Sequence, residues 1–198
     1  MPSAAILAGG LARRFGGRDK SALVIGGLTI LNRQLRVLTC VSDDVMVVVA
    51  SDRAMPLPAP MRPITDRRAG KGPIAGLGAA LAEARHRELI LVACDMPFLD
   101  AGFLAYLVSR AAQVDAVVPR TERGYHPLCA VYTREAAPFL ARALDADRLR
   151  MNDLMNEMAV RDVRGEEIDA FGPRGELLAN VNSPSEFEEL EALSGHKL

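Results

Sequence analysis

A glycine-rich, basic segment follows the first apolar run of the sequence. It reads ILAGGLARRFGGRDKSAL over residues 6–23, and its four cations are Arg13, Arg14, Arg18 and Lys20. Gly9 and Gly10 would let the backbone approach a ligand closely. Backbone N–H groups, together with Arg14 and Lys20, can bind phosphate oxygens. The segment therefore predicts a phosphate-binding loop, and a solvated loop with incidental charges is the alternative.

A carboxylate follows a later apolar run. Asp95 comes directly after ELILVAC (88–94), so its side chain should project from the carboxyl end of a strand. A carboxylate there suits Mg²⁺, which can bridge it to phosphate oxygens and neutralise their charge. An ordinary loop or cap aspartate is the alternative. Asn182, in NVNS, could supply a second oxygen to the metal or form an Asx turn beside a helix.

Short apolar runs alternate with helical patterns in the first half of the chain. The runs lack period-2 alternation, which is typical of strands buried on both faces of a parallel sheet. Strands are predicted over 3–8, 44–50, 88–94 and 115–119, and helices over 28–41, 73–86 and 101–112. This order implies an α/β sandwich with right-handed crossovers. Ligands of such sheets bind beyond the carboxyl ends of the strands, where both candidate sites fall.

The pattern changes after residue 120. A further strand is predicted over 125–132 and helices over 134–144, 149–158 and 182–193. The last helix has Ser183, Pro184 and Glu186 in place for a capping box with proline in the first turn. His126 is expected at a strand end or in the substrate pocket. The second half should complete the same sheet and add a smaller portion that faces the substrate.

Composition and charge narrow the class of protein. A chain of 198 residues suits one domain, and a formal net charge of -1 with a pI of about 6.3 does not favour binding to nucleic acid or a membrane surface. The chain runs directly into a strand-like segment, which favours a cytoplasmic protein. Cys40, Cys94 and Cys129 lie far apart in apolar neighbourhoods, so we expect three buried thiols rather than disulfides or a metal site.

Five stretches together carry a family resemblance. LAGGLARRFGGRDKSAL resembles LAGGxSxRMGGxDK, a signature of nucleotidyltransferases with a GT-A-like fold, in the form typical of the molybdenum cofactor guanylyltransferases, the MobA family. The other stretches, in the same order along almost the whole chain, are ITD (64–66), GPIAGLGAAL (72–81), ACDMPFL (93–99) and ANVNSPSEFEEL (179–190). The resemblance implies a three-layer α/β/α sandwich with a mostly parallel, mixed, Rossmann-like sheet.

The same resemblance implies roles for individual residues. It implies a GTP-binding set of Leu7, Ala8, Gly9, Gly10, Lys20, Asp66 and Asp95, and a catalytic set of Arg14, Lys20 and Asp95. Lys20 would hold the triphosphate, Arg14 would stabilise pyrophosphate, and Asp95 would carry Mg²⁺, with Asn182 as the second candidate ligand. Asp66 would accept hydrogen bonds from guanine or from ribose hydroxyls. The neighbouring Arg67, Arg68 and Lys71 either receive the phosphate of the pterin or form a solvated basic face.

The implied reaction is transfer of GMP from GTP to the terminal phosphate of molybdopterin, with release of pyrophosphate. The chain would be one domain, 1–198, in which 1–120 binds the nucleotide and 121–198 holds the molybdopterin-facing part and the C-terminal helix. GTP and molybdopterin would be its partners, without nucleic acid or membrane. The resemblance also allows transient contact with proteins that deliver molybdopterin and with molybdoenzymes.

Two other functions stay open from the sequence. One is a CTP-dependent molybdopterin cytidylyltransferase or a sugar-phosphate nucleotidyltransferase of the same fold. The other is a non-catalytic nucleotide-binding module. The LAGG motif favours GTP, because the cytidylyl and sugar enzymes usually have LAAG, and retention of Arg14, Lys20 and Asp95 favours an enzyme. Ala50 departs from the asparagine that is common in the family, which bears on base choice.

Overall fold

A computed structural model describes residues 1–8, 22–50, 57, 59, 61–66, 68 and 70–194. A central sheet takes the strand order β10-β7-β9-β6-β1-β4-β5, and β8 pairs with β7. These strands are β1 (Ser3–Leu7), β4 (Asp44–Ala50), β5 (Arg62–Asp66), β6 (Glu88–Ala93), β7 (Ala116–Thr121), β8 (Gly124–Tyr125), β9 (Cys129–Thr133) and β10 (Val160–Val163). Because β9 runs antiparallel to both β6 and β7 while β1, β4, β5 and β6 are parallel, the sheet is mixed but mostly parallel.

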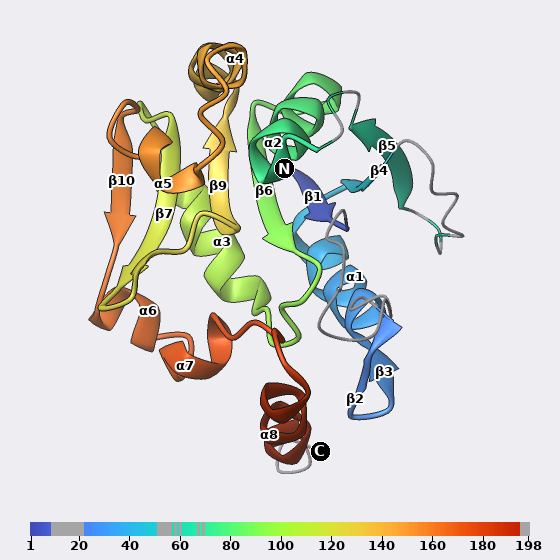
Figure 1. The fold of residues 1–198 in the computed structure, drawn as a ribbon. Coiled ribbons are helices and arrows are strands. Elements are labelled where there is room, and N and C mark those ends of the chain that lie inside the picture. The colour runs from blue at the N-terminus through green and yellow to red at the C-terminus, as the bar shows by residue number, and fades with distance from the viewer. Residues whose placement is uncertain are drawn as a thin grey trace.

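Helices cover both faces of this sheet (Figure 1). One face packs against α1 (Ile30–Val41) and α3 (Ala101–Ser109), and the other against α2 (Gly72–Glu83) and α4 (Ala137–Asp145). The described strands and helices thus form the three layers expected from the sequence. Within the described residues, no helix is long and apolar enough to span a membrane.

The remaining elements complete the fold, and most of them are short. They are the hairpin of β2 (Val24–Ile25) and β3 (Leu28–Thr29), the 3₁₀ turn η3 (Arg134–Ala136), α5 (Met151–Leu154), α6 (Glu166–Asp169), α7 (Arg174–Leu177) and α8 (Pro184–Ser194). Ile25 of the hairpin packs with Val181 and Leu190 in a separate apolar cluster. Figure 1 shows α8 beside this hairpin, at the end of the molecule toward which the arrow of β6 points.

Capping contacts mark the starts of two helices, α3 and α8. The Asp100 carboxylate accepts the Phe103 N–H at 2.7 Å at the start of α3. At the start of α8, the Glu186 N–H donates to Ser183 Oγ at 3.2 Å, and the Ser183 N–H donates to the Glu186 carboxylate at 3.0 Å. These reciprocal bonds form the predicted capping box.

The prediction of three buried thiols is wrong for Cys40. Cys129 is buried and Cys94 is half-buried, but Cys40 is exposed. Its apolar sequence neighbours Leu38 and Val41 face the sheet, whereas Cys40 falls on the solvent side of α1. A helix separates neighbouring residues by about 100° around its axis, so an apolar neighbourhood in sequence does not establish burial.

A buried carboxylate joins the amino ends of the strands. Asp44 accepts hydrogen bonds from Ser3 Oγ at 2.6 Å, from Arg62 Nε at 3.0 Å and from the Arg85 N–H at 3.1 Å. Burial alone would raise the pKa of Asp44, but the bonds from Arg62, Ser3 and Arg85 outweigh it and lower the pKa below its ordinary value. The ionised form therefore stabilises the fold.

We expect Asp44→Ala to lower the free energy of unfolding by about 2 kcal/mol, because a buried carboxylate loses several charge-assisted bonds. Because the folded pKa is depressed, this contribution is present above the ordinary pKa near 3.8 and disappears as pH falls through the folded value. Denaturant unfolding near neutral pH and in acid measures both effects. The neighbouring Asp43, whose side chain is 59% exposed, provides the control. An equal loss in Asp43→Ala would contradict this account.

Candidate functional site

The carboxyl ends of the central strands bring the predicted site residues to one edge of the sheet. β1 lies between β6 and β4, and its last residue, Leu7, is in register with Ala93 and Val48. Ala8 extends this strand, since its N–H donates to the Val48 carbonyl at 3.0 Å. The described part of the phosphate-loop motif therefore begins at the edge where parallel α/β sheets bind ligands.

Asp95 lies at this edge, two residues beyond the end of β6. Its side chain is half-buried, and its carboxylate Oδ1 accepts a hydrogen bond from Asn180 Nδ2 at 3.2 Å. Its backbone carbonyl accepts the Val181 N–H at 2.9 Å. The C-terminal segment before α8 therefore holds Asp95 through both its side chain and its backbone.

Asn180 is a site residue that sequence reasoning missed. Asn182, the residue named as a second metal ligand, has an exposed side chain, and its N–H donates to the Glu186 carboxylate at 2.6 Å. Both asparagines stand in ANVNS, and the sequence alone does not show which of them reaches Asp95. Asn182 as a metal ligand stays a prediction.

Asp66 ends β5 at the same edge. Its Oδ1 accepts the Arg68 N–H at 2.8 Å in an Asx turn, and among the described residues its Oδ2 has no hydrogen bond. The strand order β6-β1-β4-β5 puts Asp66 three strands from Asp95. At about 4.8 Å per strand, this is about 14 Å. The two carboxylates thus cannot share one metal ion, but they can contact opposite ends of an extended nucleotide.

Helix α2 begins beside Asp66 and packs against the end of β1. Gly72, its first residue, has a φ of +68°, which an L side chain rarely adopts. A Cβ at Gly76 would lie only 2.9 Å from Leu7 Cδ2. A side chain at position 76 would therefore require the Leu7 side chain to shift, and glycine lets α2 lie close to the strand that leads into the glycine-rich segment.

Several predicted site residues lie outside the described residues. These are Gly9, Gly10, Arg14 and Lys20 of the glycine-rich segment, and Arg67. Ala50 belongs to β4, but its side chain is not described. The roles assigned to these residues remain predictions.

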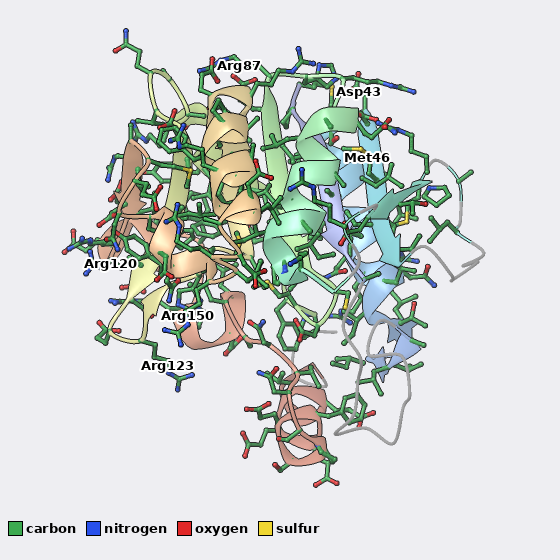
Figure 2. All side chains as sticks on the ribbon, turned by 45° about the horizontal axis from the view of Figure 1, so that its top comes forward. Asp43, Met46, Arg87, Arg120, Arg123 and Arg150 are labelled. Atoms are coloured by element: carbon green, nitrogen blue, oxygen red, sulfur yellow. The ribbon has the colours of Figure 1, made fainter. Side chains whose placement is uncertain are left out.

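The basic residues after Asp66 form surface ion pairs. Arg68 contacts Asp145 at 3.1 Å, and Lys71 Nζ contacts Asp147 at 2.7 Å, with all four side chains largely exposed. Exposed pairs of this kind contribute only about 0–1 kcal/mol, so an anionic ligand could displace them. Arg123 and Arg150 form no ion pair within the described residues, and Figure 2 shows both on the side of the molecule away from Asp43 and Arg87.

His126 lies at a strand end, directly after β8. Its Nε2 lies 2.9 Å from Thr121 Oγ1, and its N–H donates to the Pro119 carbonyl. Burial, followed by the charge of Arg123, lowers the pKa of His126 below its ordinary value. The imidazole is therefore neutral near pH 7 and does not add to the positive charge of Arg123.

The described side chains fit a metal that is shared with a substrate. No group of three or more His, Cys, Asp or Glu side chains among the described residues could enclose an ion. Asp95 is a half-buried carboxylate at the ligand-binding edge, with an amide beside it. Mg²⁺ is usually bound in this way, through one or two carboxylates together with substrate phosphates and water.

Comparisons with known proteins point to the same chemistry. Residues 4–161 match the family model described as a MobA-like NTP transferase domain. A molybdenum cofactor guanylyltransferase from Desulfosudis oleivorans is 33% identical over 94% of this chain and 93% of its own length. A probable molybdenum cofactor guanylyltransferase from Methanosarcina acetivorans is also 33% identical, over 95% of this chain and 89% of its own.

Solved structures share the fold. Molybdopterin-guanine dinucleotide biosynthesis protein A from Archaeoglobus fulgidus superimposes with a TM-score of 0.81 at 24% identity, covering 98% of this chain and 99% of that one. The 2-C-methyl-D-erythritol 4-phosphate cytidylyltransferase from Thermus thermophilus gives 0.72 at 19% identity, with 98% of each chain covered. Because the names of these two proteins refer to a guanine and to a cytidylyl nucleotide, the fold alone does not identify the base.

Proposed function

Since the chain belongs to the MobA-like NTP transferase family, we propose that it transfers GMP from GTP to the terminal phosphate of molybdopterin. An oxygen of that phosphate attacks the α-phosphorus of GTP, the bond from the α-phosphorus to the bridging oxygen breaks, and pyrophosphate leaves. The product is the guanine dinucleotide form of the cofactor. The observation that carries this proposal is the placement of Asp66 and Asp95 on either side of the strand that leads into the glycine-rich segment.

The residues act by positioning and by stabilising charge. A phosphate monoester is already ionised at neutral pH, so the attack needs no strong base. Asp66 accepts hydrogen bonds at the base or ribose end of GTP. Leu7 and Ala8 end the strand that precedes the phosphate-binding segment. In our proposal Gly9, Gly10 and Lys20 hold the triphosphate, and Arg14 stabilises pyrophosphate.

A divalent metal ion is general in this family, and we propose Mg²⁺ held by Asp95. Bound there, it supplies positive charge to the phosphate oxygens. Asn180 orients the carboxylate through its hydrogen bond to Oδ1. Asn182 is the second candidate ligand.

The two halves of the chain divide the substrates in this proposal. Residues 1–120 of the single domain bind GTP, and residues 121–198 face molybdopterin. Arg123 and Arg150, which have no acidic partner among the described side chains, join Arg67, Arg68 and Lys71 as candidates to bind the pterin phosphate. We expect a cytoplasmic enzyme, because GTP is its substrate, and transient contact with proteins that deliver molybdopterin or receive the product.

Base choice is tested by thermal stability. At 100 times its dissociation constant, GTP with Mg²⁺ should stabilise the fold by about 2.7 kcal/mol, which raises the Tm of a protein of this size by roughly 5–10 °C. CTP at the same concentration should raise the Tm much less, and pyrophosphate should appear only with GTP and molybdopterin together. Equal shifts with both nucleotides would contradict the guanylyl assignment and favour an enzyme of broader base choice.

A further inference from the structure

The turn that carries Asp95 is held by a side chain of helix α1. Gln34 Nε2 donates to the Ala93 carbonyl at 2.7 Å and to the Met96 carbonyl at 3.0 Å. These two carbonyls flank Cys94 and Asp95 in the chain. One carboxamide therefore ties together both ends of the short segment from which the Asp95 carboxylate projects.

The burial of Gln34 makes this arrangement specific. The residue is 1% exposed, and its Oε1 is buried with no hydrogen-bond partner among the described residues. Turning the amide over would place Oε1 against two carbonyl oxygens, so the two donors must face the turn. An unpaired buried acceptor destabilises a fold. An apolar side chain of the same length would avoid that cost, so packing alone does not account for a glutamine here.

Other contacts fix the remaining parts of the turn. Arg33, the neighbour of Gln34 on α1, donates from Nε to the Pro97 carbonyl at 3.2 Å and from Nη1 to the Ile25 carbonyl at 2.8 Å. Asn180 and Val181 of the C-terminal segment contact Asp95 itself. Helix α1 therefore holds the two ends of the turn, while the C-terminal segment holds Asp95 through its carboxylate and its backbone carbonyl.

We propose that Gln34 is a positioning residue for Asp95. This inference rests on the proposed function, in which Asp95 holds the metal. Gln34 touches neither substrate nor metal; it restricts the turn to the conformation that directs the carboxylate into the site. Without its two donors the turn would sample other conformations, so metal binding and turnover would weaken while metal-free GTP binding would not.

The test compares Gln34→Met with Leu38→Ala. Methionine keeps the length of the side chain but has no donor, and Leu38 is a fully buried residue one turn further along α1. We expect Gln34→Met to raise the half-saturating Mg²⁺ concentration by about tenfold or more, as loss of a group that supports a metal ligand does. Metal-free GTP affinity should stay within about twofold. Leu38→Ala should lower stability and leave the half-saturating concentration unchanged.

Hydrogen exchange provides a second measurement that needs no activity. The Val181 N–H, which donates to the Asp95 carbonyl, should exchange about tenfold faster in Gln34→Met relative to the Ile6 amide of the central strand β1, and not in Leu38→Ala. If the wild-type protein transfers no GMP, the proposed function is wrong. The hydrogen-exchange comparison still tests whether Gln34 positions the Asp95 turn.

Unchanged exchange in Gln34→Met would overturn the inference, and so would faster exchange with an unchanged metal requirement. Should Gln34→Met not fold, Gln34→Leu, which is shorter and apolar, also offers the two carbonyls no donor. Unchanged exchange, or faster exchange with an unchanged metal requirement, would overturn the inference in that variant too.

Discussion

Replacing Asp95 with asparagine is expected to lower turnover by at least about 100-fold, a loss of about 2.7 kcal/mol of transition-state stabilisation. Asparagine keeps the shape and one oxygen but removes the charge that binds a hard cation. The turn that carries residue 95 should remain in place, because Gln34, Asn180 and Val181 hold it through contacts that do not need the carboxylate charge. The steady-state rate of pyrophosphate release measures the effect.

Two further measurements separate a metal ligand from a structural carboxylate. Metal-free GTP affinity should persist or tighten in Asp95→Asn, because a carboxylate facing phosphates is repulsive when no cation lies between them. Asp100→Asn is the matched control: Asp100 caps α3, and asparagine caps a helix about as well as aspartate. Turnover should be intact in that control. Normal turnover in Asp95→Asn would contradict the metal assignment, whatever happens to stability.

Lys20→Ala should remove roughly 2–4 kcal/mol of transition-state stabilisation, in the range for a charged contact in a closed site. Lys20 lies outside the described residues, so this prediction rests on the sequence motif and on the described residues that flank it. Ala8 extends β1 next to β6, and Leu23 packs in the cluster of Val181, whose N–H contacts Asp95. Both flanks thus lie near Asp95.

The control for Lys20→Ala is removal of a cation at the end of the sheet away from Asp95. Arg110 follows α3 and stacks on Tyr106, with its guanidinium carbon 4.7 Å from the ring centroid. Arg110→Ala should leave kcat/KM unchanged, whereas Lys20→Ala lowers it and leaves the unfolding midpoint nearly unchanged. Near-native activity in Lys20→Ala would show that the glycine-rich segment is a solvated loop.

Strongly patterned elements could be predicted from the sequence, and weakly patterned ones could not. The strand over 44–50 is confirmed at both ends, since an unbroken apolar run is typical of a strand buried on both faces. The edge strand β5 was not predicted as a strand, because Pro63 lies within it and argues against a strand. Proline is tolerated at a sheet edge, where an N–H donor is not needed. The short strand β10 at the other edge was missed for lack of an apolar pattern.

Two predicted elements are interrupted in the structure. The strand over 125–132 is broken at 126–128, where Pro127 cannot donate to the ladder, so that β8 and β9 form separately. The helix over 149–158 is helical only at Met151–Leu154. Met155 and Met158 are nevertheless buried. The apolar spacing in the sequence therefore correctly indicated buried side chains, but turns as well as a helix can bury them.

The site was predictable where a side chain follows a strand directly. The end of an apolar run was enough to place Asp95 at the ligand-binding edge, and a motif was enough to place Asp66 there. Asn180 and Gln34 could not be assigned in this way, because their contacts with the Asp95 turn join residues far apart in the chain. Their roles depend on how α1 and the C-terminal segment pack against the end of β6.

The central claim is guanylyl transfer, and the most direct measurement follows the α-phosphate. The protein is incubated with molybdopterin, Mg²⁺ and GTP labelled at the α-phosphate, and the labelled products are separated. We predict that the label moves into a molybdopterin guanine dinucleotide, with one pyrophosphate released for each label transferred, and that α-labelled CTP transfers little. Label that stays in the nucleotide pool, or that enters a dinucleotide equally well from CTP, would contradict the account.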